Sequence, residues 1–276
     1  MATHDYVIDN STGANVRADI NNVLQAILSN NSSGSSPSTT VAYMLWADTT
    51  NNLLKIRNTA NSDWITLRGL DGSLTSSADA SINSVSVGKG ANSVAGNTVL
   101  GESALDASVS GGNNTAIGKN ALSALTSGSG NTSVGKDSLL LNTTGANNTA
   151  VGVEALTTVA TQGGNTALGY QALKMNETSN NTGLGYQALR LNTTGTQNVA
   201  VGLQTLNVNT TGGFNTGVGY QVLDANTTGD NNTAIGQVAL GANTTASNNT
   251  AVGKSALGAN TTGHSNVAVG SGALDA

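Results

Sequence analysis

One short phrase recurs through the last two thirds of the chain and restricts its fold more than any other feature. The phrase reads N-T-A-(V/I/L)-G-x-x-A-L, and its glycines are spaced 17 residues apart, except between Gly169 and Gly185, where the spacing is 16. From Gly101 to Gly270, each of these glycines has an Asn four residues before it and a Leu four residues after it. A fixed short period is typical of proteins in which stacked repeats contact only their neighbours. The phrase therefore predicts a mainly β fold, with a parallel β-solenoid or β-roll shaft over residues 97–276.

Side-chain alternation divides the phrase into two faces. In an extended strand the Thr and the branched aliphatic residue share one face, and the Asn and Ala share the other. Because the residue before the glycine is always Val, Ile or Leu, we expect the Thr and aliphatic face to line the coil interior. The Leu that follows would be a second inward anchor. With Thr turned inward, a flat outward array of Thr, such as ice-binding solenoids use, is not expected.

The Ala position would then lie on the outside, where uniformly small side chains indicate that another backbone packs closely. We predict a subunit interface at this position, formed by Ala116, Ala150, Ala167, Gly183, Ala200, Gly217, Ala234 and Ala251. One aliphatic row and one Leu row make a thin core for a single coil, and coils that share an interface would bury more. A closed cyclic assembly is the simplest solution, and we expect a homotrimer.

Residues 1–72 lack the repeat and are expected to form a small α+β attachment domain. Apolar residues between Val16 and Leu28 recur at helical spacing and predict one amphipathic helix. Three strand-like runs separated by polar turns predict a meander at Val41–Ala47, Leu53–Arg57 and Trp64–Arg68.

Within this domain Trp46 and Trp64 are candidates for docking on a neighbouring protein, and filling the domain's own small core is the alternative. Residues 73–96 are expected to be a neck that ends in a capping element. The phrase Asn83–Gly88 is interpreted there as a degenerate first rung, as solenoid ends commonly carry an atypical repeat.

Composition and charge argue against several classes of function. The net charge of −5 provides no basic patch for nucleic acid, and the chain has no cysteine for disulfides. No run of apolar residues is long enough to insert into a membrane, and no secretory signal is visible. His4 and His264 are isolated, so no metal site is expected, and the near match to a phosphate loop at 130–136 is a by-product of the repeat. We expect neither a cofactor nor catalytic residues, and hence no enzyme.

Three tyrosines occupy one repeat position, directly after the glycine. Tyr170, Tyr186 and Tyr220 are each followed by Gln. The structural interpretation is a stack of rings along an edge of the coil. The functional interpretation is a surface site for sugars, formed by aromatic and amide groups.

The repeat phrase, with N-T-T-G between copies, resembles the shafts of bacteriophage tail fibres, and more distantly the head repeats of trimeric autotransporter adhesins, which Asn83–Gly88 matches most closely. Asn15–Asn22, Tyr43–Asp48 and Leu54–Arg57 are similar to the virion-attachment region of marine and cyanobacterial phage fibres. The adhesin resemblance implies a trimeric left-handed parallel β-roll. The signal peptide and membrane anchor of autotransporters are not expected here.

The resemblance to phage fibres implies a structural virion protein that is made in the host cytoplasm. Residues 1–72 would attach to tail or baseplate proteins, and the shaft would contact a glycan or protein on the host surface. Two alternatives stay open: a capsid or collar decoration fibre without a receptor role, and a polysaccharide-degrading tailspike.

Overall fold

The computed structural model describes residues 32–36, 44–69 and 79–275, and it divides the chain into two compact units, Met1–Ser77 and Ala78–Ala276. The helix predicted between Val16 and Leu28 lies outside the described residues.

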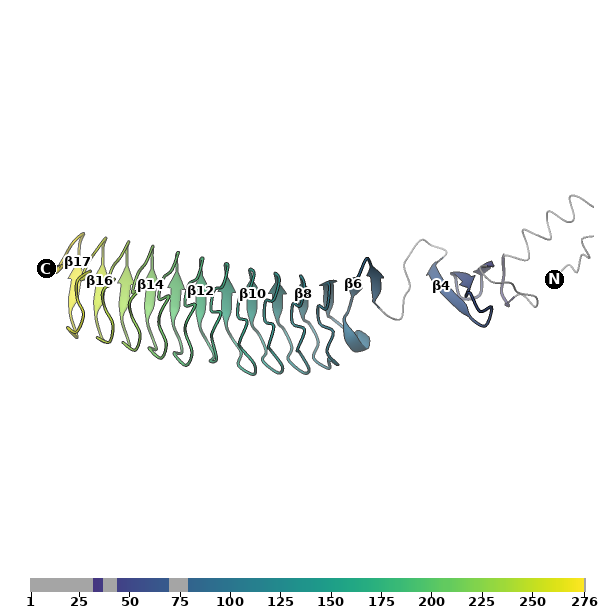
Figure 1. The fold of residues 1–276 in the computed structure, drawn as a ribbon, viewed down its shortest axis with the longest axis horizontal. Helices are drawn as coiled ribbons and strands as arrows, with labels where there is room; N and C mark the ends of the chain where they lie inside the picture. The colour runs from purple at the N-terminus through teal and green to yellow at the C-terminus, as the bar shows by residue number, and fades with distance from the viewer. Residues whose placement is uncertain (1–31, 37–43, 70–78, 276) are drawn as a thin grey trace, which may run out of the picture. The chain divides into compact units, whose positions relative to one another are not determined.

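The first unit contains a four-stranded sheet in the order β1-β2-β3-β4. These strands span Ser32–Ser33, Leu45–Asp48, Leu53–Arg57 and Trp64–Gly69 (Figure 1). Strand β1 runs parallel to β2, whereas β2, β3 and β4 form the antiparallel meander expected from the sequence.

One face of this meander carries two tryptophans, Trp46 and Trp64, and three charged side chains, Asp48, Lys55 and Arg57. The rings of Trp46 and Trp64 lie 5.2 Å apart, and the Lys55 ammonium lies 4.8 Å from the centre of the Trp46 ring. Lys55 also pairs with the buried Asp48 at 2.8 Å, and the Arg57 guanidinium lies 5.3 Å from the Trp64 ring. Because Trp46 is only 5% exposed, it belongs to the unit's own core and is not available as a docking side chain.

The second unit begins with an antiparallel hairpin. Strands β5 (Ala80–Ile82) and β6 (Val85–Gly88) pair antiparallel, and β6 pairs antiparallel with β7 (Thr98–Gly101). The two turn residues, Asn83 and Ser84, have φ angles of 50° and 66°, the conformation that closes a tight two-residue hairpin. The interpretation of Asn83–Gly88 as a degenerate rung is therefore wrong, because this turn reverses the chain where a rung would continue it.

From β7 onward the strands run parallel and build a stacked coil with one short strand per rung (Figure 1). A 3₁₀ turn, η1 (Ala91–Ser93), precedes β7. The remaining strands are β8 (Thr115–Ile117), β9 (Thr132–Val134), β10 (Thr149–Val151), β11 (Thr166–Leu168), β12 (Thr182–Leu184), β13 (Val199–Val201), β14 (Thr216–Val218), β15 (Thr233–Ile235), β16 (Thr250–Val252) and β17 (Val267–Val269). The shorter 16-residue spacing leaves the register intact, since Thr166 pairs with Thr182 as its equivalents do elsewhere.

The invariant glycine after each strand has a steric cause. Gly152 adopts a φ of 140°, and a Cβ placed on it would lie 2.3 Å from the carbonyl oxygen of Gly169 in the next rung. No side chain fits at this corner, because the backbones of adjacent rungs approach too closely there.

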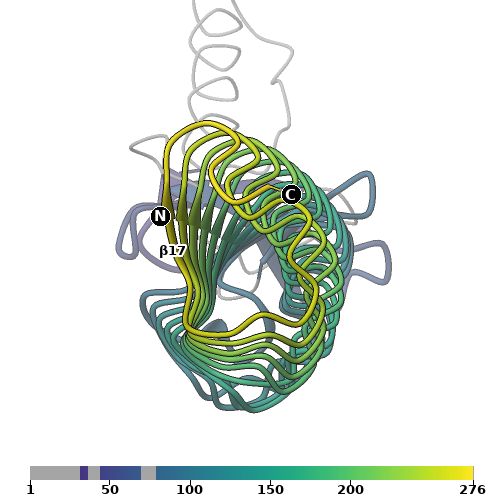
Figure 2. The same ribbon diagram turned by 90° about the vertical axis from the view of Figure 1, so that its left-hand side faces the viewer.

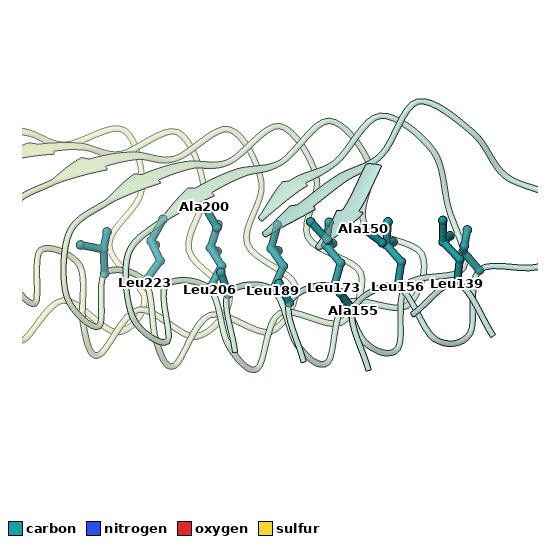
Figure 3. Close-up of a cluster of buried hydrophobic side chains, with 14 of the residues drawn as sticks. Leu139, Ala150, Ala155, Leu156, Leu173, Leu189, Ala200, Leu206 and Leu223 are labelled. Atoms are coloured by element: carbon teal, nitrogen blue, oxygen red, sulfur yellow. The ribbon is translucent and has the colours of Figure 1, made fainter. Parts of the chain in front are cut away.

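Leu and Ala fill the interior of the coil. The Leu four residues after each glycine is almost fully buried from Leu105 to Leu257, as predicted. The strands form one wall of the coil in Figure 2, and in Figure 3 Leu139, Leu156, Leu173 and their equivalents form a continuous row inside it, with Ala150 and Ala200 of the strand wall beside them.

The predicted assignment of the two strand faces is wrong. The middle residue of each strand, Ala at most rungs, points into the coil, and the Thr and aliphatic residues on either side of it point outward. The reason is space. A Cβ on Gly183 would lie 3.2 Å from the Leu173 side chain, and one on Gly217 would lie 2.6 Å from the Thr205 methyl group. The Leu row already occupies the narrow coil, so only small residues fit opposite it.

The Asn immediately before each strand forms a buried ladder along the coil. In one rung after another the Asn Oδ1 accepts a hydrogen bond from the backbone N–H of the equivalent Asn in the next rung, as from Asn114 to Asn97 and from Asn215 to Asn198, both at 2.9 Å. Its Nδ2 donates to a turn carbonyl, as Asn198 does to Gly212 at 2.8 Å. These side chains satisfy backbone groups that the narrow interior excludes from water.

A second Asn ladder runs through the N-T-T-G turns. From Asn192 to Asn260 each side-chain amide donates to the equivalent Asn one rung earlier, at 2.8 to 3.2 Å. The sequence identified these segments as turns, but their Asn side chains lie in the interior as far as Asn243.

Candidate self-association surface

The outward face of the solenoid sheet consists of two continuous columns of side chains, one on each side of the buried Ala column. Strand pairing keeps both columns in register from rung to rung. The first column is Thr98, Thr115, Thr132, Thr149, Thr166, Thr182, Val199, Thr216, Thr233, Thr250 and Val267. The second column is Leu100, Ile117, Val134, Val151, Leu168, Leu184, Val201, Val218, Ile235, Val252 and Val269. We call the two columns together the outward face.

This face is apolar and partly exposed in the single chain, with most of its side chains intermediate and a few more open. Leu168 is 50% exposed, Ile235 is 41% and Val199 is 37%. Neither column contains a charged residue, and the Thr side chains add a methyl group beside each hydroxyl. Large contiguous apolar surfaces are uncommon on soluble monomers and usually mark a site of interaction.

The residues predicted from the sequence to form the interface lie elsewhere. Their side chains face the coil interior and are buried by the chain itself, so another chain cannot reach them in this fold. This correction applies to Ala116, Ala150, Ala167, Gly183, Ala200, Gly217, Ala234 and Ala251. Sequence reasoning chose the wrong face because it took the more hydrophobic row to be the inner one.

Each of the three tyrosines singled out in the sequence directly follows the glycine at the corner of its rung. Tyr170 and Tyr186 stack, with ring centres 5.2 Å apart and planes inclined by 20°, as the structural interpretation predicted. Both are half-exposed, and so is Tyr220, which stands two rungs further on with Leu203 between.

A ladder of amides lies next to this column. Gln187, Gln204 and Gln221 each donate to the Gln one rung earlier at 3.0 to 3.3 Å, and Gln171 donates to Glu154 at 2.8 Å. In the sequence Gln171, Gln187 and Gln221 stood out only as neighbours of the tyrosines, and Gln204 follows Leu203.

Glu154 accepts the hydrogen bond at the end of this ladder, and its carboxylate has a structural role. It also accepts a hydrogen bond from Lys174 at 2.6 Å, and the bonds from Lys174 and Gln171 lower the pKa of the Glu154 carboxyl. A carboxylate engaged in this way stays ionised at neutral pH and would be a poor proton donor.

Two further acids of the solenoid, Asp137 and Asp224, have shifted pKa values. The hydrogen bond from Asn120 lowers the pKa of Asp137, and burial raises the pKa of Asp224, one oxygen of which has no partner. Among the described residues no group of three or more His, Cys, Asp or Glu could hold a metal ion. Within the same described ranges, no helix is both long and apolar enough to span a bilayer.

These features define the class of the protein: a parallel β-solenoid repeat protein built from rungs of about 17 residues. Comparison with protein-family models, curated proteins and solved structures finds no match.

Proposed function

We propose that the chain is a non-enzymatic structural fibre that associates as a homotrimer through the outward face. The observation that supports this is the pair of uncharged, in-register columns that run the whole length of the solenoid. Copies placed side by side around a three-fold axis would each contribute this face to a shared core.

The magnitude of the burial favours association. Full burial of a Val, Leu or Ile side chain is worth about 1.5–3 kcal/mol, so a half-exposed one gains roughly 1 kcal/mol when a neighbour covers it. In the second column Leu100, Leu168, Ile235 and Val269 are 41–71% exposed, and the other seven side chains are already partly buried. Their combined gain is on the order of several kcal/mol per chain, which is comparable to the ~4–15 kcal/mol that association costs in lost rigid-body freedom.

The role that fits such a rod is that of a phage tail fibre. In this proposal residues 1–72 attach to tail or baseplate proteins of the virion, and the shaft extends to a glycan or protein on the host surface. The resemblance of the repeat to phage fibre shafts supports this role. Imaging of virions with an antibody against the shaft tests it, because label on the capsid or collar would favour a decoration fibre. Loss of host capsule after incubation with the purified protein would favour a polysaccharide-degrading spike.

A charge placed on the outward face tests the association itself. We expect the double variant Val151→Asp and Val201→Asp to fold but to be monomeric by light scattering, because both side chains point away from the coil. Thr144→Asp, on an exposed turn outside both columns, is the matched control and should remain oligomeric. An oligomer that survives both buried charges would rule out this face as the interface.

The outward Thr column also supports a second candidate function, namely binding to ice. The sequence argued against it because Thr was expected to point inward, and the structure reverses that expectation. A bare, flat array of hydroxyl and methyl groups at a regular spacing would order water. This function requires the face to stay uncovered, so thermal hysteresis shown by a monomeric protein would favour it over the fibre.

A further inference from the structure

One edge of the outward face is bordered by large apolar side chains. The residue directly after the corner glycine is apolar over the five consecutive rungs of β10 to β14. Near the end of this run Leu203 is 42% exposed and Tyr220 is 46% exposed. Each stands two residues beyond the second column, so these side chains continue its apolar surface past the corner.

The opposite edge carries one aromatic residue at an otherwise polar position. The residue two before each member of the first column has a positive φ, and it is Gly, Asn, Gln or Ser in every rung but one. The exception is Phe214, the only Phe of the chain, which has a φ of 58° and is 54% exposed. Asn and Gly tolerate this left-handed conformation, whereas a bulky residue is disfavoured in it. A disfavoured, exposed aromatic residue beside an apolar face indicates a contact made outside the coil.

Phe214 and Tyr220 belong to the same rung but lie at opposite edges of the outward face. Phe214 precedes Thr216 by two residues, and Tyr220 follows Val218 by two. At about 3.3 Å per extended residue, strand β14 holds their Cα atoms roughly 10 Å or more apart. Neither ring can therefore cover the other within one chain.

The symmetry of the proposed trimer brings these two edges together. Three outward faces around one axis place the first-column edge of each copy beside the second-column edge of the next. Rotation about the axis does not change height, so residues of the same rung meet there. Phe214 of one copy then faces Tyr220 of the neighbouring copy, with Leu203 of that copy one rung earlier.

We infer that Phe214 packs against Tyr220 and Leu203 of the neighbouring copy and thereby fixes the axial register of the trimer. The inference rests on the proposed association and names the residues that set its register. The two columns cannot set it, because they repeat in every rung and a slip by one rung would bury nearly the same surface. A copy that slips by one rung places Gln237 opposite Phe214 at one of its two junctions, so the aromatic contact is lost there.

The absence of native cysteine allows the register to be read by crosslinking. Asn231→Cys with Gln237→Cys places exposed thiols at the two edges of β15 and leaves Phe214 and Tyr220 in place. Asn231→Cys with Ser271→Cys, also exposed, is offset by two rungs and serves as the control pair. A disulfide requires Cα atoms within about 7 Å, so neither pair can close across the strand of a single chain.

Both pairs are made in the full chain, with Phe214 and with Phe214→Asn. Asn stands at this position in several other rungs, so Phe214→Asn should fold. Gln197→Asn, at the same position one rung earlier, is the matched control. The chains are oxidised with glutathione disulfide after light scattering has established their mass. Tyr220→Gln, which introduces the residue of the next rung, tests the other side of the contact.

With Phe214 present, we expect the same-rung pair to form a covalent trimer at three times 27.3 kDa on non-reducing gels, and the offset pair to stay at 27.3 kDa. In Phe214→Asn and in Tyr220→Gln, crosslinking of the same-rung pair should fall and that of the offset pair should rise, whereas Gln197→Asn should change neither.

Equal crosslinking of the two pairs in the parent trimer would overturn the inference, because the copies would then have no fixed register. Unchanged crosslinking in Phe214→Asn would also overturn it, since the register would then be set elsewhere. A monomeric Phe214→Asn chain would overturn it as well, because Phe214 would then be needed for association and not for its register. A monomeric parent chain would refute the proposed function instead, and light scattering identifies that outcome before any oxidation.

Discussion

The Asn ladder is predicted to be a principal source of the solenoid's stability, and Asn198 tests it. This side chain is fully buried, accepts the N–H of Asn215 at 2.9 Å and donates to the carbonyl of Gly212 at 2.8 Å. Asn198→Ala removes both bonds and leaves the Asn215 N–H buried without a partner, whereas the Gly212 carbonyl keeps its bond from Asn209 Nδ2 at 2.8 Å. One orphaned buried group costs about 1–3 kcal/mol, so we expect a loss of roughly 1–3 kcal/mol in the free energy of unfolding.

A second substitution at the same site separates hydrogen bonding from packing. Asn198→Asp keeps the shape and the acceptor but places a carboxylate oxygen beside the Gly212 carbonyl. Burial favours the neutral carboxyl, so this variant should be strongly destabilised at neutral pH and should recover stability as the pH falls and the group becomes protonated. Thr194→Ala, on an exposed turn of the same rung, is the control and should change stability by no more than about 0.5 kcal/mol.

Urea unfolding followed by circular dichroism measures these differences, and hydrogen exchange locates them. We expect amide protection to fall first in the rungs next to Asn198, because each rung depends on its neighbours. If Asn198→Ala is as stable as Thr194→Ala, the ladder is not needed for stability and the argument fails.

Three further predictions address the interior, the corners and the first unit. Ala200→Leu, in the coil interior, should lower the free energy of unfolding by about 1–3 kcal/mol or more, whereas Ala259→Leu, at an exposed site, should leave it unchanged. Equal thermal stabilities of the two variants would contradict the inward assignment of Ala. Gly152→Ala should be more damaging than an ordinary surface change, because its Cβ would meet the Gly169 carbonyl at 2.3 Å, and unaltered thermal unfolding would refute this. Burial by itself raises the pKa of Asp48, but hydrogen bonds from Lys55 and Asn51 outweigh it and lower the pKa from 3.8 to about 2. The stability that ionised Asp48 contributes is therefore present above about pH 4 and is lost as the pH falls towards 2. Tryptophan fluorescence reports on this unit, which contains both tryptophans, and Asp48→Asn should abolish that part of the acid transition.

The repeat phrase predicted the coil, its register and its buried Leu row, because these depend on spacing alone. Alternation established that Thr149 and Val151 share a face, but not which face is inside. That choice depends on the room inside the coil, and the Leu156 row already fills it. The invariant Asn indicated the correct face. It shares a face with the Ala by alternation, and an Asn repeated in every rung is expected where its side chain hydrogen-bonds to buried backbone groups.

The hairpin at Asn83–Gly88 shows a second limit of sequence reasoning. Its composition matches the repeat, but two consecutive residues with positive φ reverse the chain, and a short stretch of sequence did not reveal this.

The measurement that tests the central proposal most directly is the mass of the full chain in solution by sedimentation equilibrium. The proposed trimer predicts a single species at three times the chain mass of 27.3 kDa, converted to the monomer by Val151→Asp with Val201→Asp. A parent chain that sediments at 27.3 kDa at every concentration would contradict it.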